Sequence, residues 1–293
     1  MENMENVLSQ FPGKMVTVNN HKMHIYTEGK GTDTLVFLSG SGTCSPVYDF
    51  KTLFSKMSDE YQIAVVEKAG YGFSEISNMP RDIDTILFET KAALKEANIN
   101  PPYILFPHSM SAIEAFYWVQ SYPDEVMAII GIDPALPIHY EIWDIDYSLK
   151  RMKLYSKLIN KRLKILRPII ANSLPPLKYG ILEEPDKKAC KAISNHRILT
   201  NDMINETSMV KENAKKIDAE ALKTVPMLFF ISNGEEVGMK EDEWEKSISD
   251  YTKELNVKIV PLNAGHYLHD ILPDEIVYES KIFIKDLLNG SLP

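Results

Sequence analysis

Short apolar runs that suit buried strands alternate with helical patterns along most of the chain, and this alternation limits the fold more than any other feature of the sequence. The apolar runs are continuous, which is typical of strands in a parallel sheet covered by helices on both faces. We therefore predict an α/β fold with a mostly parallel central sheet and helices on both faces. Strands are expected at residues 33–42, 61–72, 103–106, 126–135, 226–234 and 257–267, a hairpin at 14–29, and helices at 45–58, 82–96, 111–121, through Trp244 and Tyr251, and at 273–288.

The alternation stops in one long stretch. Between about Ile138 and Lys223 the pattern is helical, and the next strand run begins at Pro226. Because the sheet resumes after it, we interpret the stretch as an insertion rather than a separate domain. Ligands bind at the carboxyl edge of such sheets, and we expect the insertion to cap that edge. The prediction is a first core part (residues 1–137), a helical cap (138–223) and a second core part (224–293).

Charge and hydropathy limit the partners of the chain. The net charge is −9, and the basic residues are scattered apart from a stretch at 150–167 with the spacing of a solvated helix face. This argues against a nucleic-acid partner, which needs clustered positive charge. No uncharged stretch is long and apolar enough to cross a bilayer, and the acidic N-terminal residues do not resemble a signal peptide. We expect a small-molecule substrate and no stable membrane insertion, and the oligomeric state stays open.

Cysteine usage points to the compartment. The two cysteines, Cys44 and Cys190, are far apart and have neither CxxC nor metal-ligand spacing. A reduced, cytoplasmic chain is therefore the default prediction.

A serine stands at the sharpest corner of the sequence. In YILFPHSMSAIEAFYWVQ, residues 103–120, a strand run meets a helical pattern with almost no loop, and Ser109 lies at the junction. Such a corner lifts a hydroxyl above the sheet and points the following N–H, that of Met110, toward a developing negative charge. The flanking positions must be small. Ser111 fits, whereas Pro107 departs from the usual G-x-S-x-G pattern and must end the strand. A tight turn without chemistry is the alternative interpretation.

A histidine follows the last expected strand. His266 lies in LNAGHYLHD, and the carboxyl ends of parallel strands meet at one edge of a sheet. We therefore predict that it reaches Ser109 as a general base, against the alternative of a surface or buried structural histidine. His269, three residues further on, is interpreted as structural, facing away or capping the next helix.

Two places can supply the carboxylate that orients this histidine. Asp133 ends the strand after the serine helix, in GIDPA, where it can also be a simple turn residue. Glu235 and Glu236 follow the next strand in SNGEEVG, although the position three residues after Gly234, where such an acid often falls, is Val237. We favour Asp133 and keep Glu236 open as the alternative, because a triad requires geometry and not a fixed sequence position.

A glycine-rich turn follows the first central strand. In LSGSG, Gly40 and Gly42 permit close backbone approach and leave the N–H of Ser41 free to pair with that of Met110 as an oxyanion hole. The alternative is a glycine turn that only closes a strand. A phosphate loop is disfavoured because no lysine follows and no third glycine stands at dinucleotide-binding spacing.

Four landmarks in order give the chain a resemblance to the α/β-hydrolase superfamily, from about Lys14 to Leu288. They are FLSGSG for the oxyanion loop, EKAGYGFSE for the D-x-x-G-x-G-x-S turn, PHSMSA for the nucleophile elbow and AGHYLHD for the histidine loop. The chain departs from the family in having Ser39 for the usual His, Glu67 for the usual Asp, and Pro107 and Ser111 for the elbow glycines.

The resemblance implies a mechanism and the absence of a metal or organic cofactor. Ser109 would attack a carbonyl, His266 would carry its proton, Asp133 would hold the imidazole, and the Ser41 and Met110 amides would stabilise the oxyanion. The related haloalkane dehalogenases carry an Asp nucleophile, with their acid placed similarly to Asp133. A serine at position 109 argues for ester-type acyl transfer.

Three other functions remain open at this point. One is an aminopeptidase of the proline-releasing kind, for which Glu183 and Glu184 would hold the substrate amine. Another is a non-catalytic binding protein for small ligands on the same fold. The weakest is a cofactor-free lyase or oxygenase with a different role for Ser109.

Overall fold

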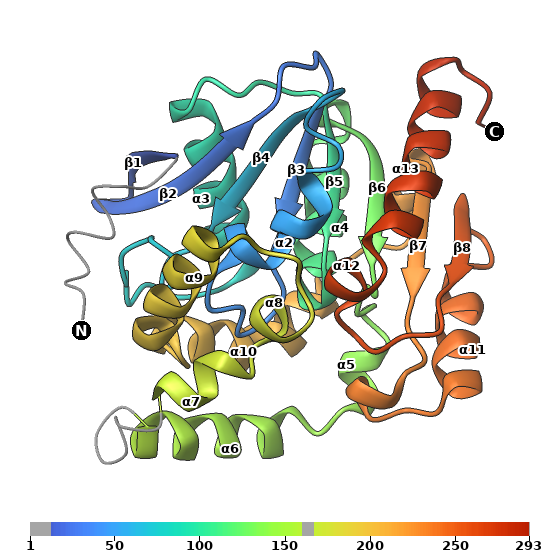
Figure 1. Ribbon diagram of the computed structural model, residues 1–293. Coiled ribbons are helices and arrows are strands. Elements are labelled where there is room, and N and C mark those ends of the chain that lie inside the picture. The colour runs from blue at the N-terminus through green and yellow to red at the C-terminus, as the bar shows by residue number, and fades with distance from the viewer. Residues whose placement is uncertain (1–12, 160–166, 293) are drawn as a thin grey trace.

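The computed structural model describes residues 13–159 and 167–292 and contains one eight-stranded sheet in the order β1-β2-β4-β3-β5-β6-β7-β8 (Figure 1). β2 runs antiparallel to both β1 and β4, and the remaining neighbours are parallel. This confirms the predicted α/β fold with a mostly parallel sheet. The strands are β1 (Lys14–Val18), β2 (His21–Glu28), β3 (Thr34–Leu38), β4 (Gln62–Glu67), β5 (Tyr103–Pro107), β6 (Val126–Ile132), β7 (Met227–Ile231) and β8 (Val257–Pro261).

Helices cover both faces of the sheet, as the continuous apolar strands require. One apolar core lies between the sheet and α3, α4 and α11, and a second lies between the opposite face and α2 and α13. Ser45 is the N-cap residue of α2 and Pro46 begins the helix, but the Ser45 side chain makes no capping hydrogen bond. These helices are α2 (Pro46–Phe54), α3 (Ile83–Glu96), α4 (Ala112–Ser121), α11 (Glu241–Thr252), α12 (Leu268–Ile271) and α13 (Pro273–Leu288).

The described residues between β6 and β7 are helical and contain no strand. Helices α6 to α10 of this helical segment gather beyond the end of the sheet to which the arrowheads of β3, β6 and β7 point (Figure 1). Lys150, Arg151 and Lys153 are exposed on α6, as predicted for a solvated face, whereas residues 160–166 of the basic stretch lie outside the described residues. The helices are α5 (His139–Ile142), α6 (Ile145–Lys157), α7 (Arg167–Asn172), α8 (Pro175–Lys178), α9 (Glu184–Arg197) and α10 (Asn201–Lys215).

Within residues 13–159 and 167–292, none of the helices combines the length and the apolar character that crossing a membrane requires.

Candidate active site

The strand–turn–helix corner holds Ser109 in a left-handed backbone conformation. β5 ends at Pro107, Ser109 has φ of 55°, and a single 3₁₀ turn leads into α4. Positive φ is unfavourable for a residue with a Cβ, and such strain persists only where the surroundings impose it. Gly40 packs against this corner, because a Cβ on it would lie 3.0 Å from the Cβ of Ser109. The chain therefore maintains a strained serine at the carboxyl end of β5, beside the glycine-rich turn.

The two departures from the usual elbow pattern are accommodated locally. The Ser111 hydroxyl donates to the carbonyl oxygens of Leu38 at 2.6 Å and His108 at 2.9 Å, and so ties the elbow to β3. Pro107 stands where the β5–β6 ladder is interrupted, since pairing with β6 stops at Leu105 and returns only as an isolated bridge at His108. Proline has no N–H to donate, but the pairing of β5 with β3 does not need one at this position. The next residue, His108, donates its N–H to the carbonyl oxygen of Leu38 in β3.

The positive φ of Ser109 leads to a prediction about the free energy of unfolding of variants at this position. We expect Ser109→Gly to raise the free energy of unfolding by about 1 kcal/mol relative to Ser109→Ala, because only glycine adopts positive φ freely. Ala112→Gly, three residues further on at φ −57°, is the matched control and should instead destabilise by about 1 kcal/mol. Urea unfolding of the three variants measures this, and equal stabilities of the two Ser109 variants would contradict it.

His266 and Asp133 are in direct contact. The imidazole Nδ1 donates to Asp133 Oδ2 at 2.5 Å, and the Asp133 side chain is fully buried. Asp133 Oδ1 accepts two further hydrogen bonds, from the N–H of Ser232 and from the indole Nε1 of Trp244, both at 2.8 Å. Because Nδ1 carries the proton that faces Asp133, Nε2 is left as the basic nitrogen of a neutral imidazole. This is the arrangement in which a histidine can take a proton from a hydroxyl.

Glu236 contacts the backbone of the same histidine. Its Oε2 accepts the N–H of His266 at 2.7 Å, and a Cβ on Gly265 would lie 2.7 Å from that oxygen. Glu235, the other alternative, is exposed, and its N–H is donated to the Asn233 side chain at 3.3 Å. Asp133 therefore contacts the imidazole ring of His266, whereas Glu236 contacts the backbone N–H of the same residue.

His108 and the chain after Asp133 bring Ser109 and His266 to the same edge of the sheet. The His108 Nε2 donates to the carbonyl oxygen of His266 at 3.2 Å, and the two rings lie 4.6 Å apart. The Ala135 N–H donates to the carbonyl oxygen of Ser109 at 3.1 Å. Burial lowers the pKa of His108 well below its usual value, and the nearby His266 and His269 act in the same direction. The buried His108 is therefore neutral, and its Nε2 carries the proton that is donated to the carbonyl oxygen of His266.

Two of the residues that support the site were not identified from the sequence. Trp244 was expected only as part of a helix, and a buried indole N–H requires an acceptor that the sequence alone does not name. For His108, the sequence shows only that it precedes Ser109. A histidine that is 1% exposed beside a candidate nucleophile shows its role only once the fold brings residue 266 to it.

His269 is buried inside the body of the protein. One of the two expectations, that it caps the next helix, is wrong, because the N-cap residue of α13 is Leu272. The Nε2 of His269 donates to Asp49 Oδ2 at 3.2 Å, and both residues are buried. Asp49, His108 and His269 each offer one ligand atom within 4.8 Å of the others, so this cluster is the group in the described residues that can hold a metal ion. His108 Nε2 and His269 Nε2 each make a hydrogen bond, whereas Nδ1 of each ring has no hydrogen-bond partner among the described residues.

The glycine-rich turn lies against the elbow and the helical segment. Gly42 has φ of 74°, and a Cβ on it would meet open space, so the backbone conformation and not crowding requires glycine there. The Ser41 N–H donates to none of the described residues. Met110 stands in the first turn after Ser109, where N–H groups have no partner within the helix. The structure therefore brings the turn that carries Ser41 beside the corner that carries Met110.

His139 lies at the start of the helical segment and contacts both the chain that follows β6 and Trp244, the residue that donates to Asp133. Its Nδ1 accepts the Leu136 N–H at 3.0 Å, so its Nε2 carries the proton and donates to Ser247 Oγ at 2.9 Å. The ring packs on Trp244 at 4.4 Å. Burial lowers the pKa of His139 to about 4, against a smaller opposing effect of Asp133.

This low pKa makes the protein sensitive to acid. Between pH 6.5 and about 4 the unfolded chain binds a proton at residue 139 that the folded chain does not, so stability is full above pH 6.5 and falls as the pH drops. We expect a loss on the order of 3 kcal/mol by pH 4. His139→Asn keeps an acceptor for Leu136 and should lack this component. Urea unfolding between pH 7 and 4.5 tests it, and parallel pH profiles of the two proteins would contradict it.

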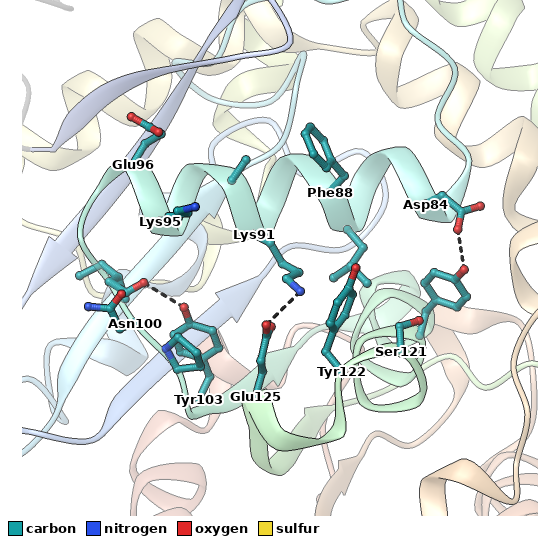
Figure 2. Close-up of a pocket in the computed structure, with 15 residues that line it drawn as sticks. Asp84, Phe88, Lys91, Lys95, Glu96, Asn100, Tyr103, Ser121, Tyr122 and Glu125 are labelled. Atoms are coloured by element: carbon teal, nitrogen blue, oxygen red, sulfur yellow. Dashed lines mark hydrogen bonds and ion pairs between the residues drawn. The ribbon is translucent and has the colours of Figure 1, made fainter.

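A wide pocket of about 560 Å³ lies away from these residues, between α3 and α4 (Figure 2). Phe88 and Tyr122 line it, together with the ion pair of Lys91 and Glu125 at 3.0 Å. None of the candidate catalytic residues lines it, and we assign it no part in the chemistry at Ser109.

Comparisons with known proteins agree with the fold. No protein-family model matches the chain. The uncharacterized protein YbdG of Bacillus subtilis (strain 168) is 36% identical over 289 residues, which cover 97% of this chain and 89% of YbdG. The epoxide hydrolase VrEH1 of Vigna radiata is similar in structure, with a TM-score of 0.70 and 18% identity over 95% of this chain and 99% of that one. The haloalkane dehalogenase DbeA of Bradyrhizobium elkani USDA94 is similar as well, with a TM-score of 0.71 and 16% identity over the same shares, 95% and 99%.

Proposed function

The chain belongs to the α/β-hydrolase superfamily and to the same family as YbdG, and we propose that it is a serine hydrolase of a small ester-type substrate. The substrate class is a carboxylic ester, a thioester or an amide. The observation that carries the proposal is the hydrogen bond of 2.5 Å between His266 Nδ1 and a buried Asp133, on the same sheet edge as the strained Ser109.

In the proposed reaction, Ser109 Oγ attacks the substrate carbonyl while His266 Nε2 accepts its proton. Asp133 holds the imidazole in the required tautomer and stabilises the imidazolium. The N–H groups of Ser41 and Met110 donate to the oxyanion of the tetrahedral intermediate. The imidazolium then protonates the leaving group, which departs and leaves an acyl-Ser109. Water, deprotonated by His266, attacks this acyl group, the acid leaves, and His266 returns the proton to Ser109 Oγ.

The identity of the nucleophile favours acyl transfer over the reactions named for the similar structures. Haloalkane dehalogenases carry an Asp nucleophile, and a carboxylate that displaces a halide forms an ester, which water can hydrolyse. A serine that displaced a halide would form an ether, which water does not cleave in the same way. Ser109 therefore suits a substrate that already has a carbonyl carbon.

We further propose that the helical segment, residues 138–223, caps the site and shapes the substrate pocket. The contact between the hydroxyls of Ser41 and Thr207, at 3.0 Å, supports this, because it joins the glycine-rich turn to α10. Glu183 and Glu184, which an aminopeptidase would use to hold an amine, are exposed, and Glu184 faces Lys187 at 3.6 Å. Their exposure disfavours the aminopeptidase.

Labelling of the intact protein with a fluorophosphonate, read by mass spectrometry, tests the proposal. We expect a single adduct on Ser109, followed by hydrolysis of p-nitrophenyl esters whose acyl length is then varied. An epoxide and a haloalkane serve as controls and should not be turned over. A folded protein that forms no adduct would exclude the serine hydrolase and favour a non-catalytic binding protein on the same fold.

A further inference from the structure

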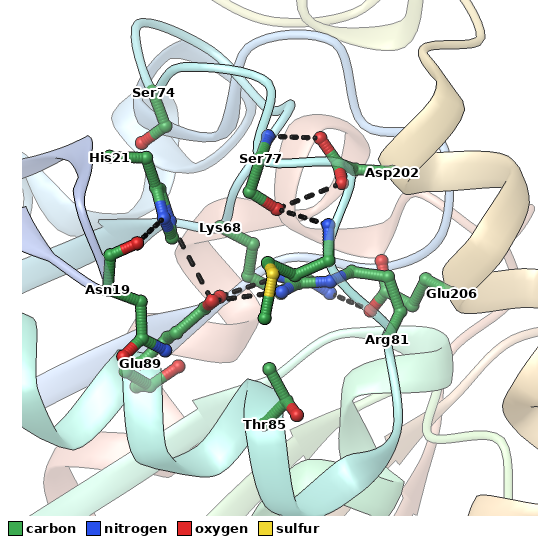
Figure 3. A network of polar contacts seen from close by, with 12 residues as sticks. Asn19, His21, Lys68, Ser74, Ser77, Arg81, Thr85, Glu89, Asp202 and Glu206 are labelled. Carbon is green, nitrogen blue, oxygen red and sulfur yellow. Dashed lines mark hydrogen bonds and ion pairs between the residues drawn. The ribbon is translucent and has the colours of Figure 1, made fainter.

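A buried ion pair joins helix α10 to the turn that follows β4, and the proposed reaction does not use it. Lys68 Nζ donates to Glu206 Oε1, and Lys68 and Glu206 are 4% and 5% exposed. Figure 3 shows both residues beside Asp202, which comes from the same helix and contacts Ser77. Burying two charges costs free energy unless their geometry and further hydrogen bonds compensate, so such a pair favours one particular seating of α10 on the body.

The ion pair extends to the glycine-rich turn through Tyr71. The fully buried Tyr71 hydroxyl donates to Glu206 Oε2, the second oxygen of the carboxylate that Lys68 holds. The same hydroxyl oxygen accepts the N–H of Gly42 at 3.4 Å. Burial, with Glu206 acting in the same direction, raises the pKa of Tyr71 well above its usual value, so the phenol keeps the proton that it donates.

Thr207, the next residue on α10, contacts the turn directly. Its hydroxyl donates to the Met203 carbonyl oxygen at 3.1 Å, in the usual manner of a threonine inside a helix. Its oxygen is therefore the acceptor for the Ser41 hydroxyl, 3.0 Å away. Ser41 thus directs its side-chain proton toward α10.

The glycine-rich turn depends on such contacts for its position. Ser41 stands between Gly40 and Gly42, and glycine gives the backbone more freedom than any other residue. An oxyanion donor is effective only if it is already in place when the charge develops. The two contacts from α10, one direct and one through Tyr71, hold the two residues that follow Gly40.

We propose that Thr207 and the Lys68–Glu206–Tyr71 network are positioning groups that hold Ser41 and Gly42 in the geometry of the oxyanion hole. The proposal rests on the function proposed above. It makes the seating of the helical segment on the body a condition for catalysis, because α10 supplies both contacts. None of these side chains touches the reacting atoms, so the loss of one should reduce turnover and leave the substrate affinity nearly unchanged.

Thr207→Val and Tyr71→Phe test the proposal, since each removes one hydroxyl and changes the volume little. We expect each to lower kcat for the ester found in the screen, and the rate of fluorophosphonate labelling, by ~10-fold, with KM within ~2-fold. Thr207→Ser keeps the hydroxyl and should restore the wild-type kcat. Thermal melting by circular dichroism checks that each variant is folded. If Thr207→Val does not fold, Tyr71→Phe alone tests the positioning role.

Asp202→Asn is the matched control. Asp202 also joins α10 to the body, through the N–H groups of Ser77 and Asn78 at 2.9 and 3.1 Å, but none of its hydrogen bonds reaches the glycine-rich turn. It should lower the melting temperature and leave kcat within ~2-fold. A wild-type kcat in both test variants, or an equal loss in Asp202→Asn, would overturn the positioning role alone. A wild-type protein that is not labelled at all would overturn the proposed function, and this inference with it.

Discussion

Replacing Ser109 by alanine should abolish fluorophosphonate labelling and lower kcat for ester hydrolysis by ~10⁴-fold or more, because no other group can form the acyl-enzyme. His266→Ala should cost about as much, and the double variant should be little worse than either single one, because the two residues act as a unit. The measurement is kcat and KM on the best p-nitrophenyl ester, with the adduct mass measured in parallel.

Ser111→Ala is the control that separates the two serines of the elbow. Ser111 donates to Leu38 and His108 and is buried, so its loss should reduce the free energy of unfolding by ~1 kcal/mol and turnover by less than ~10-fold. An adduct that persists in Ser109→Ala and disappears in Ser111→Ala would show that Ser111, and not Ser109, is the nucleophile.

Asp133→Asn should lower kcat by ~10⁴-fold although it changes the shape of the side chain hardly at all. The N–H of Ser232 and the indole of Trp244 both donate to Oδ1, so they require an acceptor there and hold the amide oxygen at that position. The amide NH₂ then faces His266 Nδ1, which must accept. The proton of the imidazole moves to Nε2, and the histidine can no longer take the proton of Ser109.

Glu236→Gln distinguishes the two carboxylates near His266. Among the described residues, the hydrogen bond that Glu236 accepts comes from the backbone N–H of His266, and glutamine retains an acceptor oxygen for it. We expect its kcat to stay within ~10-fold of the wild-type value. If Glu236→Gln costs as much as Asp133→Asn, the two carboxylates have been assigned to the wrong roles.

The sequence predicted the fold well because the determining pattern is local. Apolar runs such as residues 126–135 identify covered strands, and the order of strands and helices then limits the topology to few forms. The same rule placed Ser109, Asp133 and His266 on one edge, since each follows the end of a parallel strand. What the sequence left open depended on side-chain directions across that edge.

The choice between Asp133 and Glu236 shows this limit. Both residues follow parallel strands, and no periodicity states which carboxylate faces the imidazole and which faces the main chain. Trp244 is a further case, because its contact with Asp133 joins residues 111 positions apart. Pro107 looked unfavourable in the elbow, and only the register of β5 against β6 shows the interruption that accommodates it.

The three hydrogen bonds at Asp133 also bear on how this family can diverge. Asp133 is the buried acceptor for Ser232 and Trp244 whether or not the protein catalyses anything, and its removal would leave two buried donors unsatisfied at ~1–3 kcal/mol each. Ser109 and Asp133 both have positive φ, of 55° and 44°, but the Ser109 hydroxyl makes no hydrogen bond to the described residues, so folding does not require it. A descendant that lost its activity would therefore be free to replace Ser109 early and would keep Asp133 for the sake of folding, so among relatives the serine, and not the acid, distinguishes an enzyme from a protein that has ceased to be one.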